Sequence, residues 1–147
     1  MKVLLISAVI YCAIATCFAQ KVEFHDCGSQ LSTINEVDVN PCPSLPCIFK
    51  TNSNVTLTIT LTPNAAVSDA KSVVTGIIEG IPVPFPLPDE NACNFMTCPL
   101  APGTAVTYKT AIFVRPEYPS TNLIVQWEVT SSSGEVFCFL VPATISK

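Results

Sequence analysis

The sequence has few charged residues and no basic cluster. Asp, Glu, Lys and Arg make up 12% of its 147 residues, about half of the ~25% that is usual in globular domains. Proteins that bind nucleic acid gather Lys and Arg on one face to neutralise phosphates. After residue 19, six basic and eleven acidic side chains remain, so the net charge of this part is −5. The composition therefore excludes nucleic acid as a partner.

The chain also has few of the groups that catalysis uses. Its one histidine, His25, lies two residues before Cys27, and no nucleophile-elbow motif is present to complete a Ser–His–Asp triad. Carboxylates such as Asp89, Glu90 and Glu117 stand beside prolines, and nothing in their spacing favours a glycosidase pair. The sequence contains no Gly-rich phosphate loop and no series of metal ligands. We therefore expect a protein that is not an enzyme and that uses no metal or cofactor.

A long apolar run occurs at the start of the sequence and is not repeated. Lys2 precedes the apolar residues 3–14, and small residues such as Cys17 and Ala19 follow. The strongly apolar part is shorter than the ~20 residues of a membrane-spanning helix. Residues 1–19 are therefore expected to be a secretory signal peptide cut before Gln20. Residues 20–147 are expected to form one domain of the secretory pathway, long enough to bury a core.

Cysteine, in contrast, is plentiful. Six of the eight cysteines follow residue 19, and an even number in a secreted chain implies disulfides, with about 15 possible pairings. Two C-x4-C spacings favour the local bonds Cys42–Cys47 and Cys93–Cys98, which leaves Cys27–Cys138. A zinc site made of the four close cysteines is the alternative, but the spacing is long for a zinc knuckle and the compartment is oxidising.

The polar and apolar residues alternate as they do in β-strands. Residues 55–61, VTLTITL, place threonine at every second position, which is typical of a strand with one buried and one solvated face. Turn sequences such as NPCPSLP, KTNSN and SSSG separate further β-branched segments. These candidate strands are 22–24, 34–39, 73–81, 105–114, 123–130 and 135–141. We predict an all-β sandwich of two antiparallel sheets with about seven strands. The Cys–Trp–Cys spacing of immunoglobulin domains is missing, because the single tryptophan is Trp127.

The segment 81–88 combines proline with apolar residues. Prolines at every second position alternate with Ile81, Val83, Phe85 and Leu87. Proline has no N–H group, so this spacing removes every donor from one edge of a strand and leaves the other edge able to pair. We expect an edge strand with one apolar face that forms a lip of an opening between the sheets. A solid sandwich core and an exposed polyproline ligand are the alternatives.

The sequence also contains one clear modification motif. Asn54-Val55-Thr56 is an acceptor sequon at the start of the alternating strand. In a secreted protein such a motif predicts a glycan, here on Asn54.

Six motifs follow one another in residues 20–147. They are FHDCGS at 24–29, EVDVNPCPSLPC at 36–47, GIPVPFPLP at 80–88, EYPS at 117–120, VQWEV at 125–129 and FCFLVP at 137–142. In this order, with all six cysteines placed, they resemble the Niemann–Pick type C2 proteins, small soluble sterol carriers of the lipid-recognition (ML) domain family.

The resemblance implies a fold and a binding site. The fold is an immunoglobulin-like sandwich of two antiparallel sheets with the disulfides Cys27–Cys138, Cys42–Cys47 and Cys93–Cys98. The site is an apolar tunnel between the sheets that takes a sterol tail-first. By similarity, its mouth is formed by Phe85, Val114 and Tyr118, and Val83 and Trp127 lie deeper.

The resemblance also implies a function without bond-making. The protein would enclose a cholesterol-like sterol as a monomer, contact membranes transiently, and pass its cargo to another membrane or to a membrane-bound sterol transporter of the late endosome and lysosome. Related arthropod carriers enclose fatty acids or small apolar semiochemicals in extracellular fluid, which is a second interpretation. A disulfide-stapled adhesion or immune-recognition module with a solid core is a third. The location would be extracellular or the lumen of the endosome and lysosome.

Overall fold

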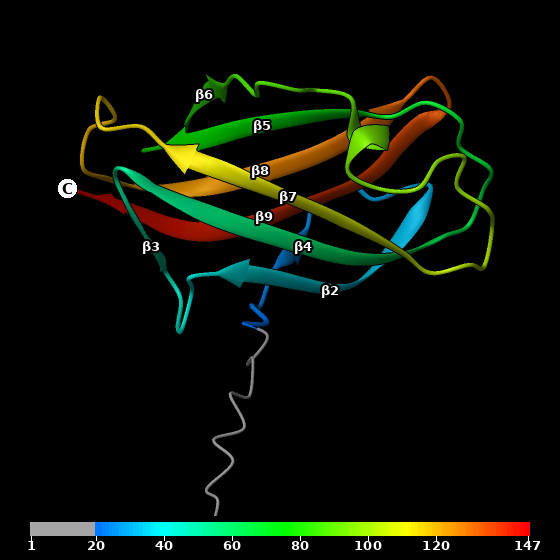
Figure 1. Cartoon of the computed structure of the whole chain (residues 1–147), viewed down its shortest axis with the longest axis horizontal. Coiled ribbons are helices and arrows are strands. Elements are labelled where there is room, and N and C mark those ends of the chain that lie inside the picture. Colours follow the sequence, from blue (N-terminus) through cyan, green and yellow to red (C-terminus); the bar gives the residue numbers. More distant parts are fainter. Residues whose placement is uncertain (1–19) are drawn as a thin grey trace, which may run out of the picture.

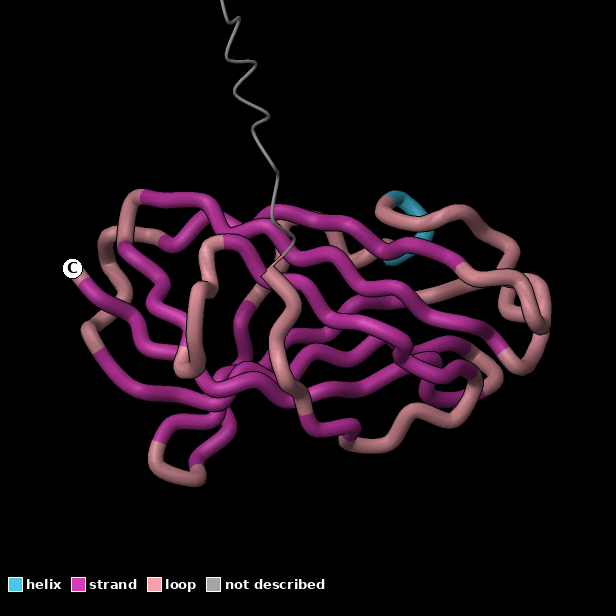
Figure 2. The backbone as a smooth tube through the Cα atoms, turned by 90° about the horizontal axis from the view of Figure 1, so that it is seen from below, coloured by secondary structure: helices cyan, strands magenta, loops and turns pink. Residues whose placement is uncertain are grey.

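The computed structural model describes residues 20–147, and strands dominate this part of the chain (Figures 1 and 2). The predicted signal peptide, 1–19, lies outside the described residues. The elements are β1 (His25–Asp26), β2 (Ser32–Asn40), β3 (Cys47–Lys50), β4 (Ser53–Pro63), β5 (Lys71–Ile78), β6 (Ile81–Phe85), the short 3-10 helix η1 (Ala92–Asn94), β7 (Val106–Val114), β8 (Thr121–Ser131) and β9 (Gly134–Ser146). Within residues 20–147, no helix has the length and apolarity that a membrane span requires.

Two sheets of unequal width form a sandwich. In the described part of the chain, one sheet has six strands in the order β1-β9-β8-β5-β6, with β3 also paired to β9, and the other has three in the order β2-β4-β7. The predicted all-β sandwich is thus confirmed. One pair departs from the antiparallel pattern, because β3 runs parallel to β9, with Cys47 opposite Ala143. β3 was not among the predicted strands, because its four residues, CIFK, show no alternation of polar and apolar side chains.

Alternation along the strands builds the core between the sheets. Val55, Leu57, Ile59 and Leu61 of β4 are at most 7% exposed, and the threonines between them lie on the opposite face. This confirms the face assignment made from VTLTITL. The core is completed from the larger sheet by residues such as Phe137, which is fully buried. Burial of apolar side chains on both inner faces is what holds the two layers together.

The predicted strand 73–81 is divided by a tight turn. β5 ends at Ile78, and β6 begins at Ile81 after a two-residue connection. Glu79 and Gly80 both have positive φ angles, 51° and 77°, as in the hairpin turns whose twist matches that of paired strands. Glutamate is uncommon in this conformation, so the sequence at position 79 did not indicate the turn.

The proline-rich strand β6 lies at the edge of the larger sheet, as predicted. It pairs with β5 alone among the described strands, with Pro82 opposite Ile77 and Pro84 opposite Thr75. In Figure 1 it lies at the top of the molecule, beyond β5. The prolines therefore leave the pairing edge intact and remove donors from the free edge.

Within residues 20–147 the structure contains three disulfides, with the pairing that the spacing favoured. Cys42–Cys47 and Cys93–Cys98 each close a short loop. Cys27–Cys138 joins residues 111 apart in sequence and fastens the segment after β1 to the middle of β9. The last bond thus connects the start of the folded domain to its final strand.

Candidate functional site

An apolar cavity of about 100 Å³ lies between the two sheets. Both sheets and the β7–β8 connection contribute to its wall, and no acidic or basic side chain of the described residues does. The lining residues are Val39, Phe49, Val55, Leu57, Val74, Thr75, Gly76, Phe85, Ile112, Val114, Tyr118, Leu123, Val125, Trp127, Phe139, Val141 and Ile145.

The size and lining of the cavity decide what it accepts. Pockets for small organic ligands commonly measure about 300–1,000 Å³, so a cavity of about 100 Å³ must widen before it encloses a whole lipid. Apolar walls offer a guest no hydrogen bonds, and apolar cavities of this order stay dry and take up apolar guests. The site is therefore suited to binding apolar ligands, and its described wall offers no acidic or basic group for a reaction on a polar substrate.

Four of the five residues that the resemblance placed at the tunnel line this cavity. Phe85 of β6 and Tyr118 of the β7–β8 connection meet edge to face, with ring centroids 5.6 Å apart. Val114, at the end of β7, is 5% exposed, and Trp127 of β8 is 2% exposed. The structure thus brings residues from β6, β7, β8 and a loop together around one space.

Val83, which was expected deeper in the tunnel, is placed differently. It is not among the residues that line the cavity, and 44% of its side chain is exposed. Ile81, two residues earlier on the same face, is 64% exposed. The reason lies in the position of β6, which is the outer strand of the six-stranded layer and is exposed at every residue before Phe85. Val83 therefore lies on the outer rim.

Most residues of the cavity wall were not among the predicted site residues. Leu123 and Val125 alternate with outward residues along β8 on the same face as Trp127, so strand alternation could have identified them. Phe49 and Ile145 are opposite each other in the parallel pair β3–β9. No local pattern predicts that pairing, so these two could not have been found.

A small polar group lies behind the cavity in the core. The Tyr108 hydroxyl and the Ser72 hydroxyl are 2.8 Å apart and both side chains are buried. Burial raises the pKa of Tyr108, and the hydrogen bond between its hydroxyl and that of Ser72 partly offsets this effect. The ring of Tyr108 packs edge to face on Trp127 at 6.2 Å. This group keeps a neutral hydroxyl pair in the core and supplies no charge to the cavity.

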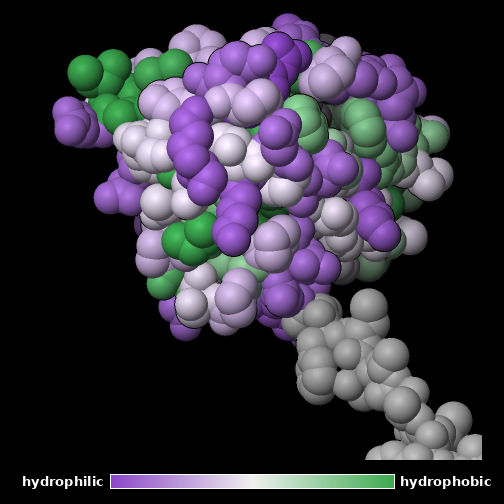
Figure 3. All heavy atoms as spheres, turned by 60° about the vertical axis from the view of Figure 1, so that its left-hand side comes forward, coloured by the Kyte–Doolittle hydropathy of each residue, from purple (hydrophilic) through white to green (hydrophobic). Residues whose placement is uncertain are grey.

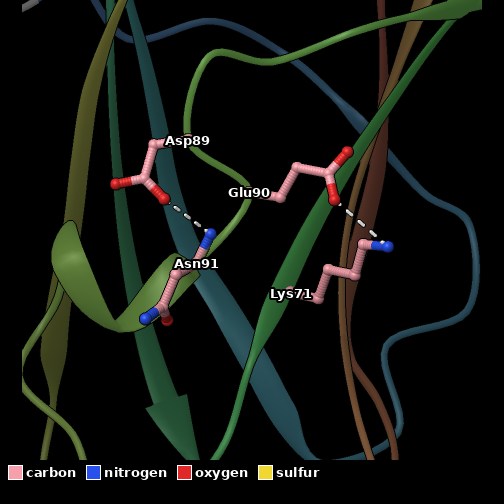
Figure 4. Close-up of polar contacts among 4 residues, drawn as sticks. All are labelled: Lys71, Asp89, Glu90 and Asn91. Carbon is pink, nitrogen blue, oxygen red and sulfur yellow. Dashed lines mark hydrogen bonds and ion pairs between the residues drawn. The ribbon is translucent and has the colours of Figure 1, made fainter.

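The carboxylates considered for catalysis hold a loop in place instead. Asp89 and Glu90 point in different directions (Figure 4). Glu90 forms an ion pair with Lys71 at 3.1 Å, and Asp89 accepts a hydrogen bond from the Asn91 backbone N–H at 2.9 Å. Hydrogen bonds from the Asn94 side chain and then from Asn91 lower the pKa of Asp89. The Glu90–Lys71 pair fastens the segment after β6 to the start of β5, and the Asp89 hydrogen bonds hold that segment together locally.

Within the described residues, one group of possible metal ligands lies close together. The ligand atoms of Glu128, Glu135 and Cys138 are within 4.8 Å of one another. Cys138 is bonded to Cys27 and has no thiolate to offer. Burial, and next the charge of Glu128, raise the pKa of Glu135 to about 7. We therefore describe this group as a pair of interacting carboxyl groups rather than a metal centre.

The fold and the site define a class: a small, disulfide-bonded β-sandwich with an apolar cavity between its layers. A model of the ML domain family matches residues 21–145 of the chain. NPC intracellular cholesterol transporter 2 of Bos taurus is 35% identical over 147 residues, 99% of each chain. The ecdysteroid-regulated 16 kDa protein of Manduca sexta is 39% identical over 131 residues, 86% of this chain and 90% of that one.

A solved structure is also similar. The crystal structure of a Niemann-Pick type C2 protein from the Japanese carpenter ant has a TM-score of 0.80 and 26% identity, and the match covers 85% of this chain and all of that one. The chain therefore belongs to the Niemann–Pick type C2 family of ML-domain proteins, as its six motifs predicted.

Proposed function

We propose that the protein is a lipid carrier that encloses a cholesterol-like sterol between its sheets and releases it unchanged. The observation that carries this proposal is the apolar cavity, which has no acidic or basic side chain in its described wall. The family supports the choice of cargo, since the bovine relative is named a cholesterol transporter. Removing apolar surface from water contributes roughly 25 cal/mol per Å², so enclosing a sterol is strongly favourable.

Uptake requires the wall to move, and the structure suggests where. Phe85 and Tyr118 meet across the boundary between β6 and the β7–β8 connection, and both rings line the cavity. β6 pairs with β5 alone among the described strands, so moving it breaks no hydrogen bonds to a second neighbouring strand. We propose that Phe85, Tyr118 and Val114 form the mouth, that Trp127 lies at the inner end, and that Val83 guides cargo at the rim.

Delivery is proposed to occur by transient contact with a membrane or by transfer to a membrane-bound sterol transporter. Viewed from the left-hand side of Figure 1, the surface mixes hydrophilic side chains with separate apolar patches (Figure 3). A mixed surface of this kind is consistent with a monomer that touches a bilayer briefly. We place the protein outside the cell or in the endosomal and lysosomal lumen. Asn54 is exposed at the start of β4, where a glycan would not disturb the core.

A second candidate cargo is a fatty acid or a small apolar semiochemical in extracellular fluid. The small cavity favours it, because a slender chain requires less widening than a fused ring system does. The adhesion-module interpretation requires a solid core, and the cavity counts against it.

The test is binding of a fluorescent sterol and of oleate, together with mass spectrometry of lipid extracted from the purified protein. Truncation of Phe85 to alanine should lower sterol affinity about tenfold, since it removes an aromatic wall worth more than 1 kcal/mol. Transfer of sterol between vesicles should slow in parallel. Thermal unfolding should change little, because Phe85 is only partly buried.

Phe113→Ala is the matched control. Phe113 is 48% exposed on β7 and does not line the cavity, so its loss should leave sterol affinity unchanged. If Phe85→Ala and Phe113→Ala bind sterol equally well, the mouth is not at Phe85. If the purified protein retains no lipid and takes up neither ligand, the carrier proposal fails.

A further inference from the structure

Gly76 lies in the middle of β5, at a position where the backbone does not require glycine. It is paired on both sides, with Val83 of β6 and Val125 of β8. Its φ angle is not in the left-handed region, unlike that of Gly80 in the adjacent turn. Glycine inside a strand is unfavourable by roughly 0.5–1 kcal/mol relative to alanine, and it often marks a place where a ligand approaches the backbone closely.

The space next to Gly76 belongs to the cavity. Gly76 is part of the cavity wall, between Val74 and the rim. A Cβ atom built at position 76 would meet Leu123 Cδ1 at 3.1 Å, and the next nearest atom is the Val83 carbonyl oxygen at 3.9 Å. No backbone atom therefore forbids a side chain here. A methyl group would fill part of the cavity and push the flexible end of Leu123.

We propose that Gly76 determines the class of lipid that the cavity accepts, because the bare β5 backbone forms a flat wall for a rigid fused-ring lipid. A sterol ring system is flat and cannot bend around a protruding methyl group, whereas an acyl chain changes its torsion angles at little cost. Gly76 thus selects for a sterol by leaving space rather than by making a polar contact. This inference rests on the proposed carrier function and specifies its cargo.

The experiment compares two probes, dehydroergosterol and oleate, on Gly76→Ala. We expect sterol affinity to fall about tenfold or more and oleate affinity to fall less than about threefold. The double variant Gly76→Ala/Leu123→Ala keeps the methyl group but removes the side chain that it pushes, so it returns part of the space and should recover part of the sterol affinity. Leu123→Ala alone is its control. If Gly76 were needed only for folding, removal of the Leu123 side chain would not restore sterol binding to Gly76→Ala.

Thermal unfolding is measured on every variant. If Gly76→Ala does not fold, Leu123→Phe fills the same space from β8 and should show the same selective loss of sterol. Equal losses for the two probes would overturn the selectivity assigned to Gly76, as would unchanged sterol affinity. Failure of the carrier proposal is distinguishable, because the unaltered protein would then bind neither probe.

Discussion

Glu135 is a carboxyl group whose ionisation opposes folding. Its Oε1 atom is buried and has no hydrogen-bond partner within the described residues, and Glu128 lies beside it. Burial and then this neighbouring charge raise its pKa from 4.5 to about 7. The folded protein therefore holds this proton more tightly than the unfolded chain does. Its contribution to stability is complete below pH 4.5 and is lost as the pH rises to about 7.

Replacing this glutamate tests the pH dependence. The unaltered protein should lose on the order of 1 kcal/mol of unfolding free energy between pH 5 and pH 7.5, a value already reduced for solvent screening of a partly exposed group. Glu135→Gln cannot ionise, so its stability should change less over this range. Urea unfolding at several pH values measures both, with the exposed Glu117→Gln as control. Equal pH slopes for Glu135→Gln and the control would contradict the assignment.

At the scale of the element, β6 shows how proline protects a free sheet edge. Pro82 and Pro84 lie in a strand that pairs on one side, so the other edge lacks two N–H donors. Pro82→Thr/Pro84→Thr should restore these donors and allow the edges of two molecules to pair. We expect concentration-dependent dimers in sedimentation velocity. Pro88→Thr, outside the strand, should stay monomeric, and the absence of any difference would mean that the prolines do not protect this edge.

At the scale of the whole molecule, the long-range disulfide should contribute the most stability. Cys27–Cys138 closes a loop of 111 residues, and Cys42–Cys47 one of 5. Loop-closure entropy predicts that Cys27→Ala/Cys138→Ala lowers the unfolding free energy by about 5 kcal/mol, and that Cys42→Ala/Cys47→Ala lowers it by about 2 kcal/mol. Denaturant unfolding of the two double variants gives the comparison. A smaller loss for the long loop would show that the entropic account does not hold here.

Local patterns predicted much of the fold. The alternation in β4 indicated which face is buried, and the proline spacing indicated that β6 is an edge strand. The site was predicted in part: Phe85, Val114, Tyr118 and Trp127 were expected around one tunnel through the resemblance, and they line one cavity. Their roles in binding stay predictions until cargo is measured.

Other features could not be predicted from neighbouring residues. The turn at Glu79 has no glycine signal at its first position, and the sequence of β3, CIFK, shows no alternation of polar and apolar residues. The parallel pairing of β3 with β9, which brings Phe49 to the cavity, joins segments almost a hundred residues apart. Contacts between such distant segments form only when the tertiary fold brings the segments together, so no local pattern indicates them.

The spacing of side chains within a few residues was enough to indicate the β class, the buried faces and the protected edge, and it favoured the disulfide pairing without excluding the others. The overlap of the two layers, in contrast, became known only when the whole fold was in view. The outer position of β6 leaves Val83 at the rim, and the separation of the layers leaves about 100 Å³ beside Gly76. Empty space between sheets is a property of both layers at once, so no single segment specifies it.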